Sequence, residues 1–163
     1  MNIIPLNRGD EARLRKIRLR SLLDAPDAFG STHDEVAARP SESWTTQIDD
    51  LTTFLAVVDG NDVGIVRGCR DDENPKRMRL LSMWVDPAVR GKGVGDALVH
   101  RLVEWARTTD ATELVLEVGG HNAPARWLYL RMGFEATGHI RRVSPPRDHL
   151  VEHEMVFRLV PNP

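Results

Sequence analysis

A short glycine-rich segment is the part of this 163-residue sequence best suited to bind a ligand. Its glycines stand at every second position, at Gly91, Gly93 and Gly95. The segment follows an apolar run that ends at Val85 and precedes a stretch of helix-forming residues. Glycine lets backbone N–H groups approach an anion closely, and the start of a helix adds unpaired N–H groups and partial positive charge. With Arg90 and Lys92 beside it, the segment predicts a nest of amides that suits a diphosphate.

Two common diphosphate motifs do not fit this segment. The pattern G-x-x-x-x-G-K-[ST] is absent from the sequence. The dinucleotide pattern G-x-G-x-x-G fails because Asp96 stands where its third glycine is required. A tight strand-to-helix turn that binds nothing is the alternative interpretation of the segment taken alone.

A second motif lies in the segment NAPARWLYLRMGF at residues 122–134. Asn122 is a natural cap for a helix start. Ala125 and Tyr129 are four residues apart, which places them on one helix face. Taken alone, Tyr129 is typical of a packed aromatic residue with its hydroxyl at the surface.

Together, the segments VDPAVRGKGVG and LEVGGHNAPARWLYLRMGF resemble the GCN5-related N-acetyltransferase (GNAT) superfamily in both order and separation. The resemblance covers residues 77–134, whereas residues 1–50 match only loosely. It implies a mixed α/β (α+β) fold with a central, mostly antiparallel sheet of about seven strands and helices on both faces. It also implies that two neighbouring parallel strands, 77–85 and 113–118, splay apart and admit a thioester.

The same resemblance implies acetyl-coenzyme A (acetyl-CoA) as the acyl donor. The amides of residues 90–95 are implied to hold its pyrophosphate, and the backbone of residues 83–85 to pair with its pantetheine arm. Asn122 and Ala125 are implied to flank that arm, with Tyr129 near the sulfur. The cofactor-binding residues implied in this way are Met83, Trp84, Val85, Arg90, Gly91, Lys92, Gly93, Val94, Gly95, Asp96, Asn122, Ala125 and Tyr129.

Acetyl transfer to an amine needs no protein nucleophile, because the amine attacks the thioester carbonyl directly. A primary amine with a pKa of about 10.4 is mostly protonated at neutral pH, so a base should help. Glu117 is the candidate base, since relatives that acetylate peptide N-termini use an acid at this position. His121 is a second candidate, and a purely structural or solvated Glu117 is the alternative interpretation. The backbone N–H of Val85 or of its neighbour is a candidate donor to the oxyanion, and Tyr129 a candidate donor to the leaving thiolate.

The elements that must position these residues follow from periodicity and turn signals. We expect a helix at 10–24, a β-hairpin within 53–69, and a short helix that ends at residue 49 and is capped by Ser41 or Ser43. The strand–helix–strand unit from 77 to 118 should be a right-handed crossover between parallel strands. The remaining expected elements are a strand at 2–6, a helix at 94–108 with Val94, Leu98, Leu102 and Trp105 on one stripe, a helix at 122–133, and strands at 135–143 and 152–160.

Length, composition and charge argue against several other classes of protein. The length fits one domain over residues 1–163, and 41% hydrophobic with 28% charged residues is typical of a globular chain. A net charge of −2 gives no overall basic field, so no nucleic-acid partner is expected, and the basic run at 13–20 is interpreted as a solvated helix face. Cys69 alone cannot form an internal disulfide, and no apolar run is long enough to span a membrane. We therefore expect a cytoplasmic protein with no membrane partner.

Metal chemistry is not expected from this sequence. The segment HLVEH at residues 149–153 matches the zinc motif H-x-x-E-H, which requires a helix. It leads instead into a strand pattern, where its two His residues would be about 13 Å apart. The tryptophans are expected in the core or in the walls of the acceptor pocket, at Trp44, Trp84, Trp105 and Trp127.

The acceptor is the least specified part of the function. It should contact residues 24–35 and 144–149, where Asp27, Asp34 and Glu35 could attract a cationic amine, although solvated loop acids are the commoner case. A peptide N-terminus, a lysine, a polyamine, an amino acid and an aminoglycoside-like drug all stay open. The alternative to an enzyme is a noncatalytic acyl-CoA-binding or regulatory module. A homodimer is expected only from the family resemblance.

Overall fold

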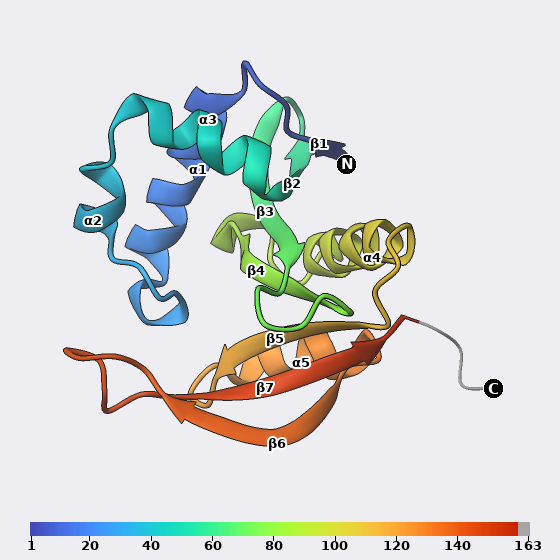
Figure 1. Ribbon diagram of the computed structural model, residues 1–163. Coiled ribbons are helices and arrows are strands. Elements are labelled where there is room, and N and C mark those ends of the chain that lie inside the picture. Colours follow the sequence, from blue (N-terminus) through green and yellow to red (C-terminus); the bar gives the residue numbers. More distant parts are fainter. Residues whose placement is uncertain (160–163) are drawn as a thin grey trace.

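One seven-stranded sheet forms the centre of the molecule in the computed structural model, which describes residues 1–159. The strand order is β1-β2-β3-β4-β5-β7-β6, and every neighbouring pair is antiparallel except β4 with β5. The strands are β1 (Asn2–Pro5), β2 (Thr52–Val58), β3 (Asn61–Arg70), β4 (Arg77–Val85), β5 (Glu113–Gly119), β6 (Glu135–Arg142) and β7 (Val151–Arg158). The mixed, mostly antiparallel sheet expected from the sequence is confirmed (Figure 1).

Helices cover both faces of the sheet, as expected. One hydrophobic core joins the sheet to α4 and α5, and a second joins its other face to α1, α2 and α3. The helices are α1 (Glu11–Asp24), α2 (His33–Ala37), α3 (Ser41–Asp50), α4 (Val94–Arg107) and α5 (Ala123–Arg131), with single 3₁₀ turns η1 (Pro26–Ala28) and η2 (Pro87–Val89). Within the described residues, none of the helices combines the length and apolar character needed to cross a bilayer.

Helix α4 packs on the sheet through the apolar stripe expected from its sequence. Val94, Leu98 and Leu102 are buried, and Trp105 is partly buried against the same core. A Cβ atom added at Gly68 of β3 would lie 2.5 Å from the Trp105 ring. This glycine therefore lets the helix approach the sheet closely, which fixes the position of the helix start that carries the glycine loop.

Helix α1 covers the opposite face of the sheet. Leu14 and Ile17 are buried in a core that also contains Trp84 of β4. Arg18 lies beside them and is only 5% exposed. The interpretation of residues 13–20 as a solvated helix face is therefore wrong for Arg18, which lies on the packed side of α1, whereas Arg15 and Lys16 of the same run are exposed.

The parallel strands β4 and β5 separate along their length, which confirms the expected splayed pair. Only Arg77, Met78 and Arg79 of β4 have backbone partners on β5. Farther along β4, the pairing with β3 shifts register between Leu81 and Trp84, and Ser82 adopts a φ of 55°. An extra residue of this kind bends a strand and increases its twist, so the bulge turns the end of β4 away from β5.

The β2–β3 hairpin lies where the sequence predicts it. Its turn residues Asp59 and Gly60 both have positive φ, at 49° and 77°. Two successive residues in this conformation make the tight turn that matches the twist of paired strands. The hairpin places β3 beside β4, where it supports the end of β4 that faces the cavity described below.

Three details of the sequence prediction need correction or fall outside the structure. Neither Ser41 nor Ser43 caps α3: the N-cap is Pro40, and the Ser43 hydroxyl donates to the Pro40 carbonyl at 2.8 Å instead. Trp127 is 67% exposed on α5 and belongs neither to the core nor to a pocket wall, whereas Trp44 and Trp84 are buried. Val160, the last residue of the predicted final strand, lies outside the described residues.

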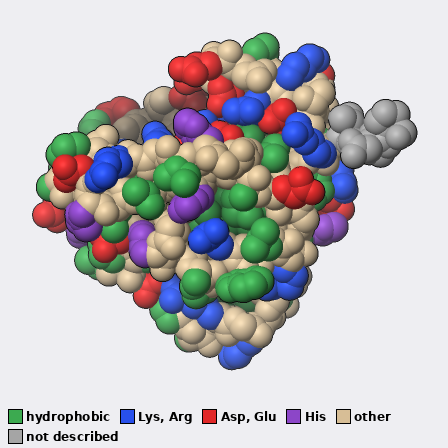
Figure 2. All heavy atoms as spheres, turned by 90° about the horizontal axis from the view of Figure 1, so that it is seen from below, with side chains coloured by type: hydrophobic (Ala, Val, Ile, Leu, Met, Phe, Trp, Pro, Cys, Tyr) green, Lys and Arg blue, Asp and Glu red, His purple; other side chains and the backbone are tan. Residues whose placement is uncertain are grey.

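The face seen from below carries side chains of every kind. Figure 2 shows hydrophobic side chains lying among Lys, Arg, Asp and Glu side chains over this face. Charges of both signs are therefore spread over it, in line with a net charge of −2.

Candidate active site

A cavity of about 700 Å³ lies between the end of α1, the end of β4, the glycine loop and α5. The predicted cofactor-binding residues that line it are Met83, Trp84, Val85, Arg90, Gly91, Gly93, Gly95, Asp96, Asn122 and Ala125. The structure therefore brings the two sequence motifs together at one hollow. Lys92, Val94 and Tyr129 are not among its lining residues, and the roles of all thirteen predicted residues stay predictions.

The glycine loop presents backbone amides at the start of α4. Gly91 and Gly93 have φ of 76° and 80°, a conformation that L side chains rarely adopt. Gly93 is the N-cap of α4, no side chain caps the helix, and its first backbone bond joins the Ala97 N–H to the Gly93 carbonyl at 3.1 Å. A Cβ atom added at Gly91 or Gly93 would meet nothing within 4 Å. The loop thus leaves both open space and unpaired helix amides, an arrangement that fits a diphosphate.

Gly95 has a different task from its two neighbours. It lies inside the first turn of α4, and a Cβ atom added there would lie 3.2 Å from Leu128 of α5. The missing side chain therefore lets α4 and α5 approach each other beside the cavity. Val94 is buried in the core and anchors the same turn.

The basic residues beside the loop make specific contacts. Arg90 donates from Nε to the Val85 carbonyl at 2.9 Å and from Nη2 to Asp24, the last residue of α1. Trp84 Nε1 donates to the same Asp24 carboxylate at 2.8 Å. These contacts tie the end of α1 to the end of β4. Lys92 is exposed, and its Nζ donates to the Ala88 carbonyl at 3.2 Å.

Arg131 at the end of α5 is a cavity-lining cation that sequence reasoning missed. Its guanidinium forms an ion pair with Asp96 in the first turn of α4, with Nε 3.3 Å from Oδ2. The pair offsets the negative charge of Asp96 beside the glycine loop. Nothing in the sequence prediction indicates Arg131, because Leu128, which lies three residues earlier on the same helix face, is also outside that prediction.

Helix α5 starts as predicted. Asn122 Oδ1 accepts a hydrogen bond from the Ala125 N–H at 3.3 Å, which confirms the predicted cap. Tyr129 is 5% exposed and packs against Phe134, with ring centroids 5.7 Å apart. Burial raises the pKa of the Tyr129 phenol, so it stays protonated at neutral pH. Its helix neighbours Ala125 and Leu128 line the cavity, although Tyr129 does not.

Glu117 lies on β5, two residues beyond the last residue that pairs with β4. Its carboxylate is held by two arginines, with Oε2 at 2.6 Å from Arg141 and Oε1 at 3.5 Å from Arg79. These ion pairs compete with any incoming ammonium group for the same oxygens. His121 folds back over the end of the strand, since a Cβ atom added at Gly119 would lie 2.5 Å from its ring.

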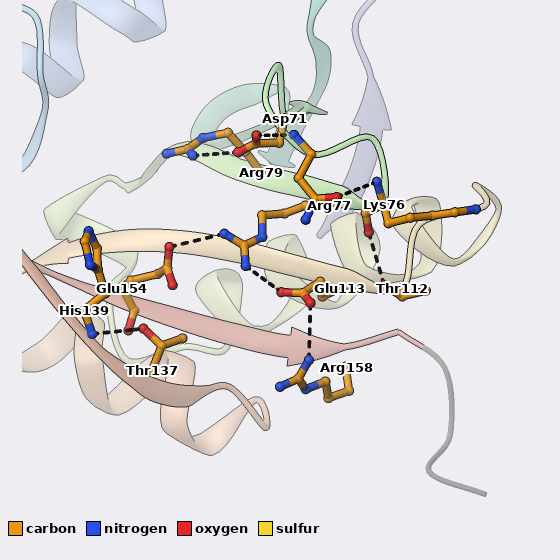
Figure 3. A network of polar contacts seen from close by, with 11 residues as sticks. Asp71, Lys76, Arg77, Arg79, Thr112, Glu113, Thr137, His139, Glu154 and Arg158 are labelled. Carbon is orange, nitrogen blue, oxygen red and sulfur yellow. Dashed lines mark hydrogen bonds and ion pairs between the residues drawn. The ribbon is translucent and has the colours of Figure 1, made fainter.

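Similar ion pairs continue along this side of β4, β5 and β7. Figure 3 shows Arg77 between Glu113 and Glu154, with Arg158 also bound to Glu113. The arginines on this part of the sheet therefore have carboxylate partners.

The two loops expected to shape the acceptor site lie against each other. Arg147, within the loop 144–149, donates to the backbone carbonyls of Pro26, Phe29 and Gly30. Phe29 also lines the cavity, together with Ala25 and Ala28 from the same loop. The remaining lining residues outside the prediction are Pro124 and Leu128 of α5.

The three acids of residues 24–35 that could attract an amine are either exposed or part of a helix cap. Asp34 is fully exposed. Glu35 accepts a hydrogen bond from the Thr32 N–H at 2.8 Å and so completes a capping box at the start of α2. Asp27 is also exposed. Their contacts are those of solvated and capping residues.

The fold and the glycine-lined cavity together define the class of protein. A sheet with one splayed parallel pair, and an amide nest where the crossover helix starts, are the features of an N-acetyltransferase fold. Residues 17–134 match the family model described as the acetyltransferase (GNAT) family. The chain belongs to this family.

Individual relatives support the same assignment. The N-acetylaspartate synthetase of Rattus norvegicus is 39% identical over 85 residues, which cover 52% of this chain and 28% of that protein. The mycothiol acetyltransferase of Actinosynnema mirum is 30% identical over 127 residues, covering 77% of this chain and 41% of that protein. The chain thus spans less than half the length of either relative.

A solved structure shows the same fold. The yncA protein of Salmonella typhimurium, solved with its cofactor acetyl-CoA, superposes with a TM-score of 0.82 at 19% sequence identity. The match covers 100% of this chain and 96% of that one.

Proposed function

We propose that this chain is an N-acetyltransferase that transfers the acetyl group of acetyl-CoA directly to a primary amine. The observation that carries the proposal is the cavity that the glycine loop and the end of β4 both line. Family membership and the names of the two relatives support it. The open amides at Gly91 and Gly93 fit the pyrophosphate of coenzyme A.

The free edge of β4 is the proposed site of the pantetheine arm. Beyond Arg79, this edge has no backbone partner on β5. An extended amide-containing chain can therefore pair with residues 83–85 as an added strand would. Asn122 and Ala125 line the cavity from the other side and bound the same arm.

The reaction needs a neutral amine and a protonated leaving thiol. Only about 0.1% of a primary amine is neutral at pH 7.4, which corresponds to about 4 kcal/mol. Glu117 is the proposed base, acting directly or through water, because it lies where β4 and β5 separate. The backbone N–H of Val85 is the proposed donor to the oxyanion, and the protonated Tyr129 phenol the proposed donor to the thiolate.

A thiol-release assay tests the proposal. Purified protein, acetyl-CoA and a panel of amines should yield free coenzyme A with at least one amine, and calorimetry should register coenzyme A binding. Binding without thiol release from any amine would favour a noncatalytic acyl-CoA-binding module. Absence of both would remove the basis of the proposal.

Two further properties belong to the proposal. A cytoplasmic location is supported by the single cysteine, Cys69, which suits a reducing compartment. A homodimer is supported only by the family resemblance. Light scattering on the purified protein measures the oligomeric state.

A further inference from the structure

Two arginines are buried on the side of the sheet that α1 and α3 cover. Arg18 of α1 is 5% exposed and Arg67 of β3 is 6% exposed. Arginine is rarely buried this far in a protein unless a carboxylate pairs with it. The partners of these two side chains therefore need an explanation.

Every hydrogen-bond partner of the two guanidinium groups is neutral. Arg67 donates from Nε and Nη2 to Ser82 Oγ at 3.0 and 2.9 Å, and from Nη1 to Gln47 Oε1 at 2.9 Å. Arg18 donates from Nη1 to Ser21 Oγ at the long distance of 3.4 Å, and its guanidinium lies 5.0 Å from the centre of the Phe29 ring. Over residues 1–159, Arg18 Nε and Nη2 have no protein acceptor, and they are not among the fully buried nitrogen atoms without a partner, so they keep some contact with solvent.

No carboxylate compensates this positive charge. Among the described residues, no Asp or Glu oxygen lies within 4 Å of Arg18, Arg67 or the nearby Arg39. Burial, together with repulsion from the neighbouring arginines, lowers the pKa of Arg67 to about 9 and that of Arg18 to about 10. Both groups therefore still carry their charge at neutral pH.

Arginines elsewhere in the sheet, in β4, are paired with carboxylates. Arg79 is paired with Asp71, and Arg77 with Glu113 (Figure 3). Both arginines are more exposed than Arg67. Even a buried ion pair is often no more stable than apolar residues of the same volume, and a buried charge without a partner is costlier still. Unpaired buried cations are thus costly for folding, and a bound anion would offset that cost.

The cluster lies next to the cavity. Phe29, whose ring stacks against the Arg18 guanidinium, lines the cavity. Ser82, which accepts two of the three hydrogen bonds that Arg67 donates, directly precedes the lining residue Met83. Ser82 is also the residue with a φ of 55° at which β4 turns away from β5. Arg18, Arg67 and Ser82 do not themselves line the cavity, so the positive charge lies one layer of residues behind its wall.

We infer that Arg18 and Arg67 bind a carboxylate group of the acceptor, so that the acceptor is an amine that also carries an acid group. The inference rests on the proposed acetyltransferase function and names its substrate class. A guanidinium group binds a carboxylate through two parallel hydrogen bonds, and two such groups suit an acceptor with one or two carboxylates. The exposed Asp34 and the capping Glu35 offer no comparable buried site for a polycation.

Four compounds on one carbon frame test the substrate class. Aspartate has two carboxylates, asparagine and isoasparagine have one each, and aspartic diamide has none. Thiol release should give a kcat/KM for the diamide at least about tenfold below that of the best carboxylate-bearing compound, since a hydrogen bond to a charged group has about this effect. Of the four compounds, the diamide has the largest fraction of neutral amine. A site that does not bind carboxylates would therefore acetylate the diamide fastest, and a higher kcat/KM for the diamide would overturn the inference.

An aminoalkylphosphonate of matched length separates the two kinds of anion. The inference requires that the amino acid be the better acceptor. A clear preference for the phosphonate would overturn the assignment to a carboxylate.

The variants Arg18→Met and Arg67→Lys test the residues. Arg18→Met should lower kcat/KM for the carboxylate-bearing acceptors by about 10- to 100-fold and leave that for the diamide within about threefold. Its Tm should not fall, because the variant removes an unpaired buried charge. Arg67→Lys keeps the positive charge but replaces the planar guanidinium group by an ammonium group. Its decrease in kcat/KM for the carboxylate-bearing acceptors should therefore be smaller than that of Arg18→Met.

Arg101→Met is the matched control, because Arg101 is also stacked on a ring, 4.4 Å from the centre of Phe54, but on the opposite side of the sheet. It should leave the preference for carboxylates unchanged. If the wild type and Arg18→Met prefer carboxylate-bearing acceptors over the diamide by the same factor, the role of Arg18 is overturned.

A binding measurement keeps this inference separate from the proposed activity. Succinate should raise the Tm of the wild-type protein and not that of Arg18→Met, whereas succinamide should raise neither. If no amine releases thiol but succinate still binds in this way, the acetyltransferase proposal fails and the anion site stands. If amines are acetylated but succinate has no effect and the diamide is the best acceptor, the anion site fails alone.

Discussion

Arg79 of β4 and Val115 of β5 form the last backbone pair between the two parallel strands. Beyond this pair, the bulge at Ser82 turns β4 away, and the free strand edge lines the cavity. The side chain of Arg79 also binds Glu117 and Asp71. One residue thus marks the end of the pairing and orients the proposed base.

Gly93→Ala should weaken coenzyme A binding far more than it weakens the fold. Gly93 has a φ of 80°, so alanine costs about 1–2 kcal/mol of strain, and its methyl group would occupy space that the amides leave open. Losing one amide contact to a phosphate should raise the Kd about 10- to 100-fold in calorimetry. Gly60→Ala is the matched control, because Gly60 has a φ of 77° and equally open space, but in the β2–β3 turn. Equal loss of affinity in both variants would contradict a role of the loop in binding.

Tyr129→Phe should lower kcat about 100-fold and leave acetyl-CoA affinity nearly unchanged. The ring contact with Phe134 is kept, so the Tm should stay within a few degrees. Because burial raises the pKa of the phenol, Tyr129 does not titrate between pH 6 and 9, and the shape of the kcat profile should be the same in both proteins. Unchanged turnover would show that Tyr129 only packs.

Features that local sequence encodes could be predicted. The glycines at positions 91 and 93, the cap at Asn122 and the stripe of α4 each depend on residues a few positions apart, and the structure has them where they are expected. The splayed strands followed from the family resemblance. The bulge at Ser82 had no such signal, because serine rarely takes a positive φ and nothing in the run RMRLLSMWV indicates it.

The buried arginines could not be read from the sequence for a related reason. Arg18 lies in a basic run that is typical of a solvated helix, and it is buried because α1 packs against α2, α3, η1 and β3. Arg67 meets Gln47 and Ser82, which are far from it in sequence. Contacts of this kind depend on the tertiary structure, so no pattern of neighbouring residues in the sequence indicates them.

Glu117→Gln should lower kcat about 100-fold at pH 7 if Glu117 is the base. The deficit should shrink as the pH approaches 10, because free amine then becomes abundant without a base. Glu154→Gln is the matched control, since Glu154 pairs with Glu117 across β5 and β7 and is bound to Arg77 at 3.6 Å. A loss that is equal in both variants, or independent of pH, would assign Glu117 a structural role.

Asp71→Asn should destabilise the protein at neutral pH and much less in acid. Arg79 holds the pKa of the Asp71 carboxyl below its ordinary value, and the N–H groups of Glu73 and Asn74 add to this at 2.9 and 3.0 Å. In the unfolded chain the carboxyl binds its proton at a higher pH. The stabilisation is therefore fully present above the ordinary pKa and is lost as the pH falls through the lower, folded value.

The pH dependence of Tm checks this sign. At pH 7 the Tm of Asp71→Asn should lie about 2–4 °C below that of the wild type, and the gap should close below about pH 4. Asp110 makes similar ion pairs with Arg70 and Lys76, but it is 67% exposed, so water screens them. Asp110→Asn should leave the Tm within about 1 °C at every pH. A difference in Tm that persists in acid would contradict this prediction. It would mean that Asp71 stabilises the fold through packing and hydrogen bonds rather than through its charge.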